Sequence, residues 1–158
     1  MHIKRNFGPV YDSGSTVLIL GSFPSVKSRE AAFFYGHPQN RFWPLMGRIL
    51  GRDSPADIEG RRKVMLEEGI ALWDVIEECD IIGSSDSSIK NVIPVDIMRI
   101  LNCAPIRGIY CNGGTSFNLF MKHLYPVCGI TPVKLPSTSP ANAAYSVDRL
   151  YNEWKEIR

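Results

Sequence analysis

The chain has 158 residues, of which 44% are hydrophobic and 22% charged, and its formal net charge is +2. This composition is typical of a folded globular protein and excludes a disordered or fibrous chain. The length suits one domain spanning residues 1–158. The longest apolar run, residues 17–20, is too short to cross a bilayer, and the first residues show no secretory leader. We therefore expect a cytoplasmic protein without a membrane partner.

The small charge is compatible with a nucleic-acid partner but does not require one. Four cysteines lie far apart without any C-x-x-C pair, namely Cys79, Cys103, Cys111 and Cys128. Zinc sites normally need closely spaced ligands, so the spacing predicts reduced cysteines, no metal ion and no cofactor.

In chain order, the sequence predicts a strand at residues 16–20, helices at 41–50 and 56–68, a strand at 70–73, a helix at 95–102, a strand at 108–111, a helix at 115–124, a strand at 132–135 and a helix at 147–157. Helical spacing is clearest in the first helix, where Phe42, Leu45, Met46 and Ile49 share one face. The alternation predicts an α/β fold of three layers, α/β/α, with a central four-stranded parallel sheet.

Each predicted strand runs into an unusual polar loop. These loops read GSFPS (21–25), WDV (73–75), NGG (112–114) and LPSTSPAN (135–142). Loops that follow parallel strands gather at the carboxyl edge of the sheet, where ligands bind. The sequence therefore predicts a site at this edge. No GxxxxGK[ST] or GxGxxG motif follows a strand, which argues against a nucleotide-utilising enzyme.

Two of these loops stand in a fixed order with a third motif. GSFPS is followed by HPQNRFW (37–43) and, late in the chain, by PSTSPAN. This arrangement resembles the uracil-DNA glycosylase superfamily, especially its deoxyinosine (hypoxanthine-DNA) glycosylase branch and, less closely, its mismatch-specific branch. The resemblance implies a monofunctional DNA glycosylase of base excision repair. Such an enzyme would hydrolyse the N-glycosidic bond of hypoxanthine or uracil in DNA, without a cofactor and as a monomer.

The resemblance also implies site residues. The asparagine of the HP-x-N motif, Asn40, is expected to act at the base or on the attacking water, although an asparagine here also suits a helix N-cap. Tyr35 matches the aromatic residue that stacks on the extruded base. Gly21 and Phe23 are expected to line the base pocket, and His37 to donate to the base or to a phosphate.

Two positions depart from the superfamily pattern. Relatives carry an aspartate or asparagine at the position of Phe23 to hold the catalytic water, and classical members carry a histidine near Ser137. Catalysis is therefore expected to shift to Asn40, to backbone groups or to Ser22. A catalytically weak or inactive nucleic-acid-binding protein of the same fold is the alternative.

The LPSTSPAN segment corresponds to the loop that enters DNA beside the flipped base. Ser137 and Ser139 are expected to bind phosphates with help from Thr138, with Pro140 and Ala141 in the same loop, although the segment also suits a turn before the last helix. Ala141 occupies the position of the bulky wedge in mismatch-specific relatives. Elsewhere, Asp74 is a candidate general base, and Arg29, Lys134 and the polar residues 86–90 are candidate backbone contacts.

Overall fold

The computed structural model describes residues 1–158. Its central sheet has the order β3-β2-β6-β7, and every strand pair in it is parallel. The strands are β2 (Val17–Gly21), β3 (Ile70–Asp74), β6 (Gly108–Asn112) and β7 (Val133–Leu135). Every residue of β2 and β3 is buried, as their continuous apolar sequences require for strands covered on both faces. The predicted four-stranded parallel sheet is confirmed.

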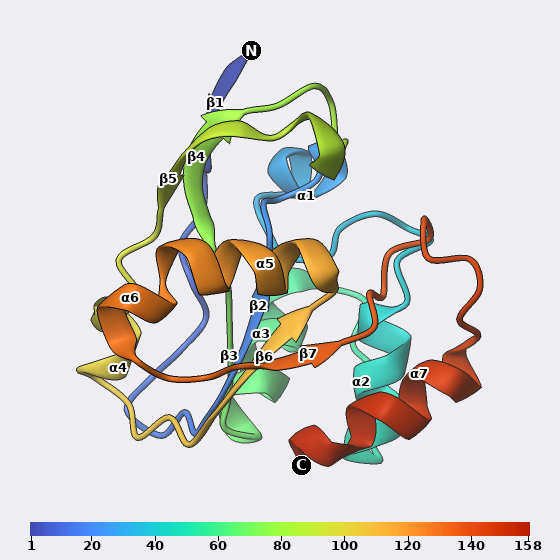
Figure 1. Cartoon of the computed structure of the whole chain (residues 1–158). Helices are drawn as coiled ribbons and strands as arrows, with labels where there is room; N and C mark the ends of the chain where they lie inside the picture. Colours follow the sequence, from blue (N-terminus) through green and yellow to red (C-terminus); the bar gives the residue numbers. More distant parts are fainter.

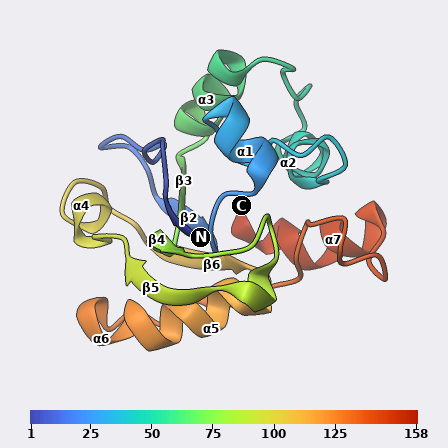
Figure 2. The same ribbon diagram turned by 90° about the horizontal axis from the view of Figure 1, so that it is seen from above.

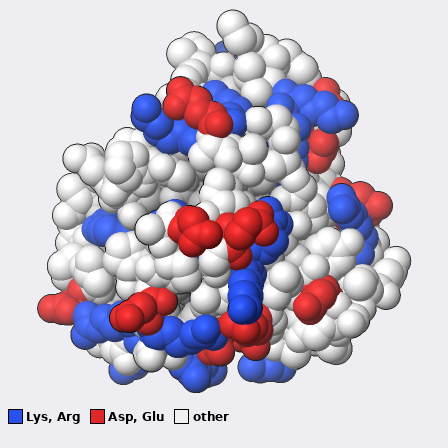
Figure 3. Space-filling view, turned by 180° about the vertical axis from the view of Figure 1, so that it is seen from behind, with Lys and Arg blue, Asp and Glu red and all other residues white.

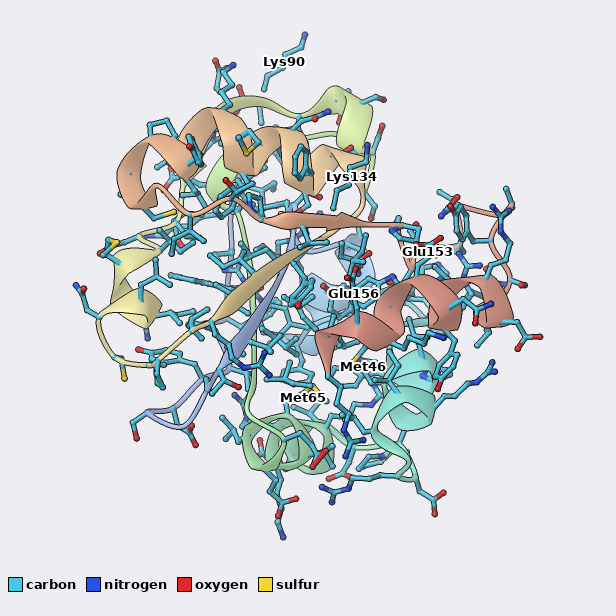
Figure 4. The ribbon with its side chains drawn as sticks, turned by 60° about the horizontal axis from the view of Figure 1, so that its bottom comes forward. Met46, Met65, Lys90, Lys134, Glu153 and Glu156 are labelled. Atoms are coloured by element: carbon cyan, nitrogen blue, oxygen red, sulfur yellow. The ribbon has the colours of Figure 1, made fainter.

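Helices cover both faces of this sheet (Figures 1 and 2). One layer contains α1 (Val26–Ala31), α2 (Phe42–Leu50) and α3 (Ile58–Glu67), and the opposite layer contains α5 (Gly114–His123) and α6 (Tyr125–Cys128). Helix α7 (Val147–Trp154) packs against α2. Met46 of α2 and Met65 of α3 point into the interior between these helices and the sheet (Figure 4). The predicted three layers are therefore confirmed.

A second sheet, absent from the sequence prediction, stands above the first (Figure 1). It is antiparallel, with the order β1-β4-β5, and consists of β1 (His2–Lys4), β4 (Ile76–Asp80) and β5 (Lys90–Pro94). Only Val75 separates β3 from β4, so no loop sequence marks where one strand ends and the next begins. The chain bends at Val75. The Val75 and Ile76 N–H groups donate to the carbonyls of Gly21 and Ser22 and tie this bend to the end of β2.

Other elements also differ from the prediction. The short α1 was not predicted; Ser25 caps it by accepting from the Ser28 N–H. The predicted helix at 95–102 is only the single turn α4 (Met98–Leu101). Short 3₁₀ turns occupy Asp86–Ser88 (η1) and Lys155–Ile157 (η2).

The surface gives little further indication of a partner. No helix combines the length and apolar character that a membrane span would need. On the face shown in Figure 3, basic and acidic side chains lie intermixed, so this face carries no extended field of one sign. The most distinctive part of the molecule is the carboxyl edge of the parallel sheet.

Candidate active site

A cavity of about 520 Å³ opens at the carboxyl edge of the parallel sheet. Its walls come from the ends of β2, β3 and β6, from residues 34–40, from the β4–β5 loop and from residues 137–141. The predicted convergence of loops is therefore confirmed for all four polar segments. The volume lies in the range typical of sites for small organic groups.

A buried ion pair forms part of this cavity. Asp74, the last residue of β3, is 4% exposed, and its Oδ2 accepts from Nη1 of the equally buried Arg5 at 3.0 Å. Its Oδ1 has no hydrogen-bond partner in the chain and lies so close to Gly21 that a Cβ there would be 2.4 Å away. Burial raises the pKa of Asp74, and the charge of Arg5 opposes this rise. One carboxylate oxygen is thus anchored while the other is available to the cavity.

Asn40 belongs to a chain of hydrogen bonds that crosses the site. Its Oδ1 accepts from the Phe42 N–H at 2.9 Å and from the Thr138 hydroxyl at 2.8 Å. Thr138 in turn accepts from Nδ2 of Asn112 and donates its own N–H to Oδ1 of Asn112, each at 3.0 Å. With Oδ1 doubly engaged, the orientation of the Asn40 amide is fixed, and its Nδ2 donates to no group of the chain. The Phe42 contact resembles that of an N-cap residue, and it leaves Nδ2 of Asn40 free.

Arg41 fixes the loop that carries Thr138. Its guanidinium donates to the carbonyls of Ser139 at 2.6 Å and Asn142 at 3.0 Å, and also to the carbonyl of Tyr145. Its main-chain N–H donates to the Thr138 carbonyl at 3.1 Å. Residues 137–145 are therefore held against the start of α2.

The aromatic residues divide between the cavity and the core. Tyr35 lines the cavity, and Phe42 stacks on its ring with centroids 4.0 Å apart. Its φ of +54° is uncommon for a residue with a side chain, and its hydroxyl is buried without a partner. Burial, together with the charge of Asp74, raises the pKa of Tyr35. Phe33 stacks on Trp43 within the core, so only Phe34 of the two preceding phenylalanines reaches the cavity.

Ser22, Phe23 and His37 all line the cavity. Phe23 is nearly buried, and the guanidinium of Arg29 lies 5.6 Å from its ring centroid. Nδ1 of His37 accepts from the Gln39 N–H at 3.1 Å, which leaves Nε2 to carry the proton of the neutral ring. The Ser22 hydroxyl donates to Oδ1 of Asp86 at 3.2 Å.

The LPSTSPAN loop (135–142) differs from expectation at one residue, Thr138. Ser137, Ser139, Pro140 and Ala141 lie at the cavity rim, but the side chain of Thr138 is fully buried. Its hydroxyl is engaged by two asparagines, so it is not available to a phosphate. The Ser137 and Ser139 oxygens accept from the N–H groups of Ser139 and Ala141, and their hydroxyl protons are free.

The two basic candidates for phosphate contact outside this loop, Arg29 and Lys134, differ in how firmly their side chains are held. Arg29 donates to the carbonyls of Pro24 at 2.7 Å and Gly83 at 3.2 Å, so it joins two cavity loops instead of reaching outward. Lys134 is exposed and points from β7 toward the start of α5 (Figure 4). Its Nζ lies 6.0 Å from the Phe117 ring centroid, and it remains a candidate contact.

Three side chains that organise the cavity were not among the predicted site residues: Arg5, Arg41 and Asn112. Asn112 stands in the NGG loop, whose polarity marked the loop but not this side chain. Gly113 beside it has φ +98°, and a Cβ there would lie 3.1 Å from the Ser137 side chain, which explains the glycine. Arg5 and Arg41 occupy sequence contexts that are equally typical of solvated residues.

A three-layer α/β/α protein with such a pocket at the carboxyl edge of four parallel strands has the architecture of the uracil-DNA glycosylase superfamily. Comparison with known proteins agrees. A hypoxanthine DNA glycosylase from Methanosarcina acetivorans is 33% identical over 156 residues, 98% of each chain. One from Methanosarcina barkeri is 38% identical over 89 residues, 56% of each chain.

The structural comparison leads to the same superfamily. The solution structure of a protein from Methanosarcina acetivorans, described as a candidate uracil DNA glycosylase, superposes with a TM-score of 0.83 and 33% identity, covering 99% of this chain and 96% of that one. No protein-family model matches the sequence. The chain belongs to the hypoxanthine-DNA glycosylase branch of the uracil-DNA glycosylase superfamily.

Proposed function

We propose that this protein is a monofunctional DNA glycosylase that releases deaminated bases, hypoxanthine above all, from DNA. One observation carries the proposal: a single cavity of base-binding size contains both a free acceptor, Oδ1 of Asp74, and a free donor, Nδ2 of Asn40. The cavity is complete within one chain, so the enzyme is expected to act as a monomer.

The Asp74 carboxylate favours a deaminated base on chemical grounds. Deamination replaces an exocyclic amine by a carbonyl and turns the adjoining ring nitrogen, N1 of adenine or N3 of cytosine, from an acceptor into an N–H donor. A carboxylate oxygen accepts that N–H, whereas it repels the lone pair of an unmodified ring nitrogen. Because Arg5 holds Oδ2, Oδ1 keeps a fixed position for this contact. The site therefore complements hypoxanthine and uracil and disfavours adenine and cytosine.

Asn40 is the proposed catalytic group. Breaking the base–sugar bond leaves negative charge on the departing base, and a fixed N–H donor lowers the energy of that state. The free Nδ2 of Asn40 is such a donor, because Thr138 and the Phe42 N–H hold the opposite end of the amide. The Ser22 hydroxyl is proposed to act beside it at the sugar.

The remaining cavity residues would receive the extruded nucleotide. The ring of Tyr35, supported from one side by Phe42, offers a face for stacking, with Gly21 and Phe23 completing the pocket. Nε2 of His37 supplies a further donor to the base or to a phosphate. The hydroxyl groups of Ser137 and Ser139 have no acceptor within the chain, so they can donate hydrogen bonds to the phosphates that flank the lesion. Pro140 and Ala141 at the rim would lie nearest the gap left in the duplex.

Base release from single-lesion oligonucleotides tests this function. Duplexes that carry hypoxanthine, uracil, xanthine or unmodified adenine at one position are incubated with excess enzyme, and abasic product is revealed by alkaline cleavage. We expect fastest cleavage at hypoxanthine and none at adenine. Binding of the hypoxanthine duplex without base release, by protein that is correctly folded, would instead favour the alternative of an inactive DNA-binding member of the fold.

A further inference from the structure

The cavity contains a second carboxylate, Asp86, that the proposed base contacts leave unused. It lies in the β4–β5 loop at the start of η1 (Asp86–Ser88), in a segment that lines the same cavity as Ser22. The η1 turn closes through main-chain atoms, with the Ile89 N–H donating to the Asp86 carbonyl, so the turn does not need this carboxylate. The side chain has one hydrogen bond within the chain, from the Ser22 hydroxyl, and no ion-pair partner.

An unpaired carboxylate is unexpected at a surface that receives DNA. It repels phosphates, and it adds a negative charge to a chain whose net charge is only +2. Glycosidic bond cleavage, however, places positive charge on the sugar as the base departs, and a nearby carboxylate favours that charge. Such a group stabilises the transition state more than the ground state, which is the requirement for catalysis.

The position of Asp86 strengthens this interpretation. Ser22, which holds it, directly precedes Phe23, and the Phe23 side chain is apolar and nearly buried. The GSFPS loop after β2 therefore offers no carboxylate or amide side chain of its own to a water molecule. The β4–β5 loop brings one to the same place, 64 residues further along the chain. Asp86 is an exposed residue whose carboxyl group is partly desolvated by the cavity wall. This desolvation raises its pKa, the hydrogen bond from Ser22 opposes the rise, and the charge of Asp74 adds to it. The raised pKa makes the carboxylate a better proton acceptor than a fully solvated aspartate.

We propose that Asp86 is a catalytic residue that stabilises the cationic sugar and orients the attacking water, an inference that rests on the proposed glycosylase function. As the bond between the sugar C1′ and the base nitrogen breaks, its electron pair leaves with the base. The water oxygen then bonds to C1′, and the water gives one proton to the Asp86 carboxylate. That proton passes to solvent, and the base anion takes a proton from solvent, which restores the enzyme.

The test compares Asp86→Asn with Asp53→Asn. Asp53 is exposed, lies outside the cavity and makes no ion pair, so its variant controls for loss of one surface charge on DNA binding. Single-turnover release of hypoxanthine is measured for each variant. A competition assay then compares two duplexes that cannot react: one with a neutral tetrahydrofuran abasic analogue, and one with a positively charged pyrrolidine analogue that imitates the cationic sugar.

We expect Asp86→Asn to release base about 10²-fold more slowly or worse, and Asp53→Asn to match the wild type. The wild type and Asp53→Asn should bind the cationic analogue at least about tenfold more tightly than the neutral one, and Asp86→Asn should lose this preference while binding the neutral analogue normally.

Three results would overturn the assignment: wild-type base release by Asp86→Asn, equal weakening of both analogues, or a wild type without preference for the cation. If the wild type releases no base at all, the proposed function fails, but the analogue preference still decides whether Asp86 recognises a cationic sugar.

Discussion

Removing the Asn40 amide should affect both catalysis and stability, and the structure separates the two. The free Nδ2 is the proposed donor to the departing base, and loss of one such fixed donor costs about 10²–10³-fold in rate. The Oδ1 accepts two hydrogen bonds, from the Phe42 N–H and the Thr138 hydroxyl. Asn40→Ala should therefore also destabilise the fold by roughly 1–3 kcal/mol. In a protein of this size, that corresponds to a fall in Tm of about 2–12 °C.

Thr138→Val is the matched control, because valine keeps the shape of threonine and removes only the hydroxyl. It retains Nδ2 of Asn40 but deletes one of the two hydrogen bonds that fix the amide, and it leaves Nδ2 of Asn112 without an acceptor. We expect a similar stability loss, roughly 1–3 kcal/mol. The rate should fall less than in Asn40→Ala, by about tenfold, since one fixed hydrogen bond to the amide persists.

Single-turnover base release below the Tm of each variant, with thermal unfolding followed in parallel, measures both effects. Wild-type turnover in Asn40→Ala would remove Asn40 from the mechanism. Equal rate losses in the two variants would show that orientation of the site, not the Nδ2 donor itself, limits the reaction.

Gly21→Ala should slow hypoxanthine release at least about tenfold, because the new Cβ would lie 2.4 Å from Oδ1 of Asp74 and must displace it. Circular dichroism should show that the fold is retained. An unchanged rate would mean that Asp74 does not take part in base recognition. The wild-type enzyme should prefer mispaired or single-stranded lesions, since Ala141 is too small to replace a flipped base. Ala141→Leu should raise the rate of base release from stable pairs. Equal wild-type rates on mispaired, single-stranded and stably paired lesions, unchanged in Ala141→Leu, would show that the wedge residue lies elsewhere. Affinity for DNA should fall with salt by a slope that corresponds to roughly three to five phosphate contacts, measurable by fluorescence anisotropy, and a flat salt response would contradict phosphate binding.

Much of the fold was predictable because its signals are local. The strands β2 and β3 are buried on both faces, so their sequences are continuously apolar and end at polar residues. The polar ends, including Asp74, therefore pointed to the correct edge of the sheet. The strands β4 and β5 gave no comparable signal, because they are partly exposed and contain several polar residues, and β4 follows β3 without an intervening loop.

The contacts that organise the site were not predictable, because they join residues far apart in the chain. Asn40 and Thr138 are separated by 98 positions, and the Arg5–Asp74 pair by 69. Nothing adjacent to Thr138 shows that its hydroxyl faces inward, so a surface role was the natural interpretation of a Ser/Thr/Pro loop.

The same contacts explain why two separate motifs identified the family better than either one alone. Asn40 and Arg41 of HPQNRFW bind the main chain and side chains of PSTSPAN directly. The two motifs are one structural unit, so a substitution in PSTSPAN should disturb the orientation of Asn40, the proposed catalytic residue.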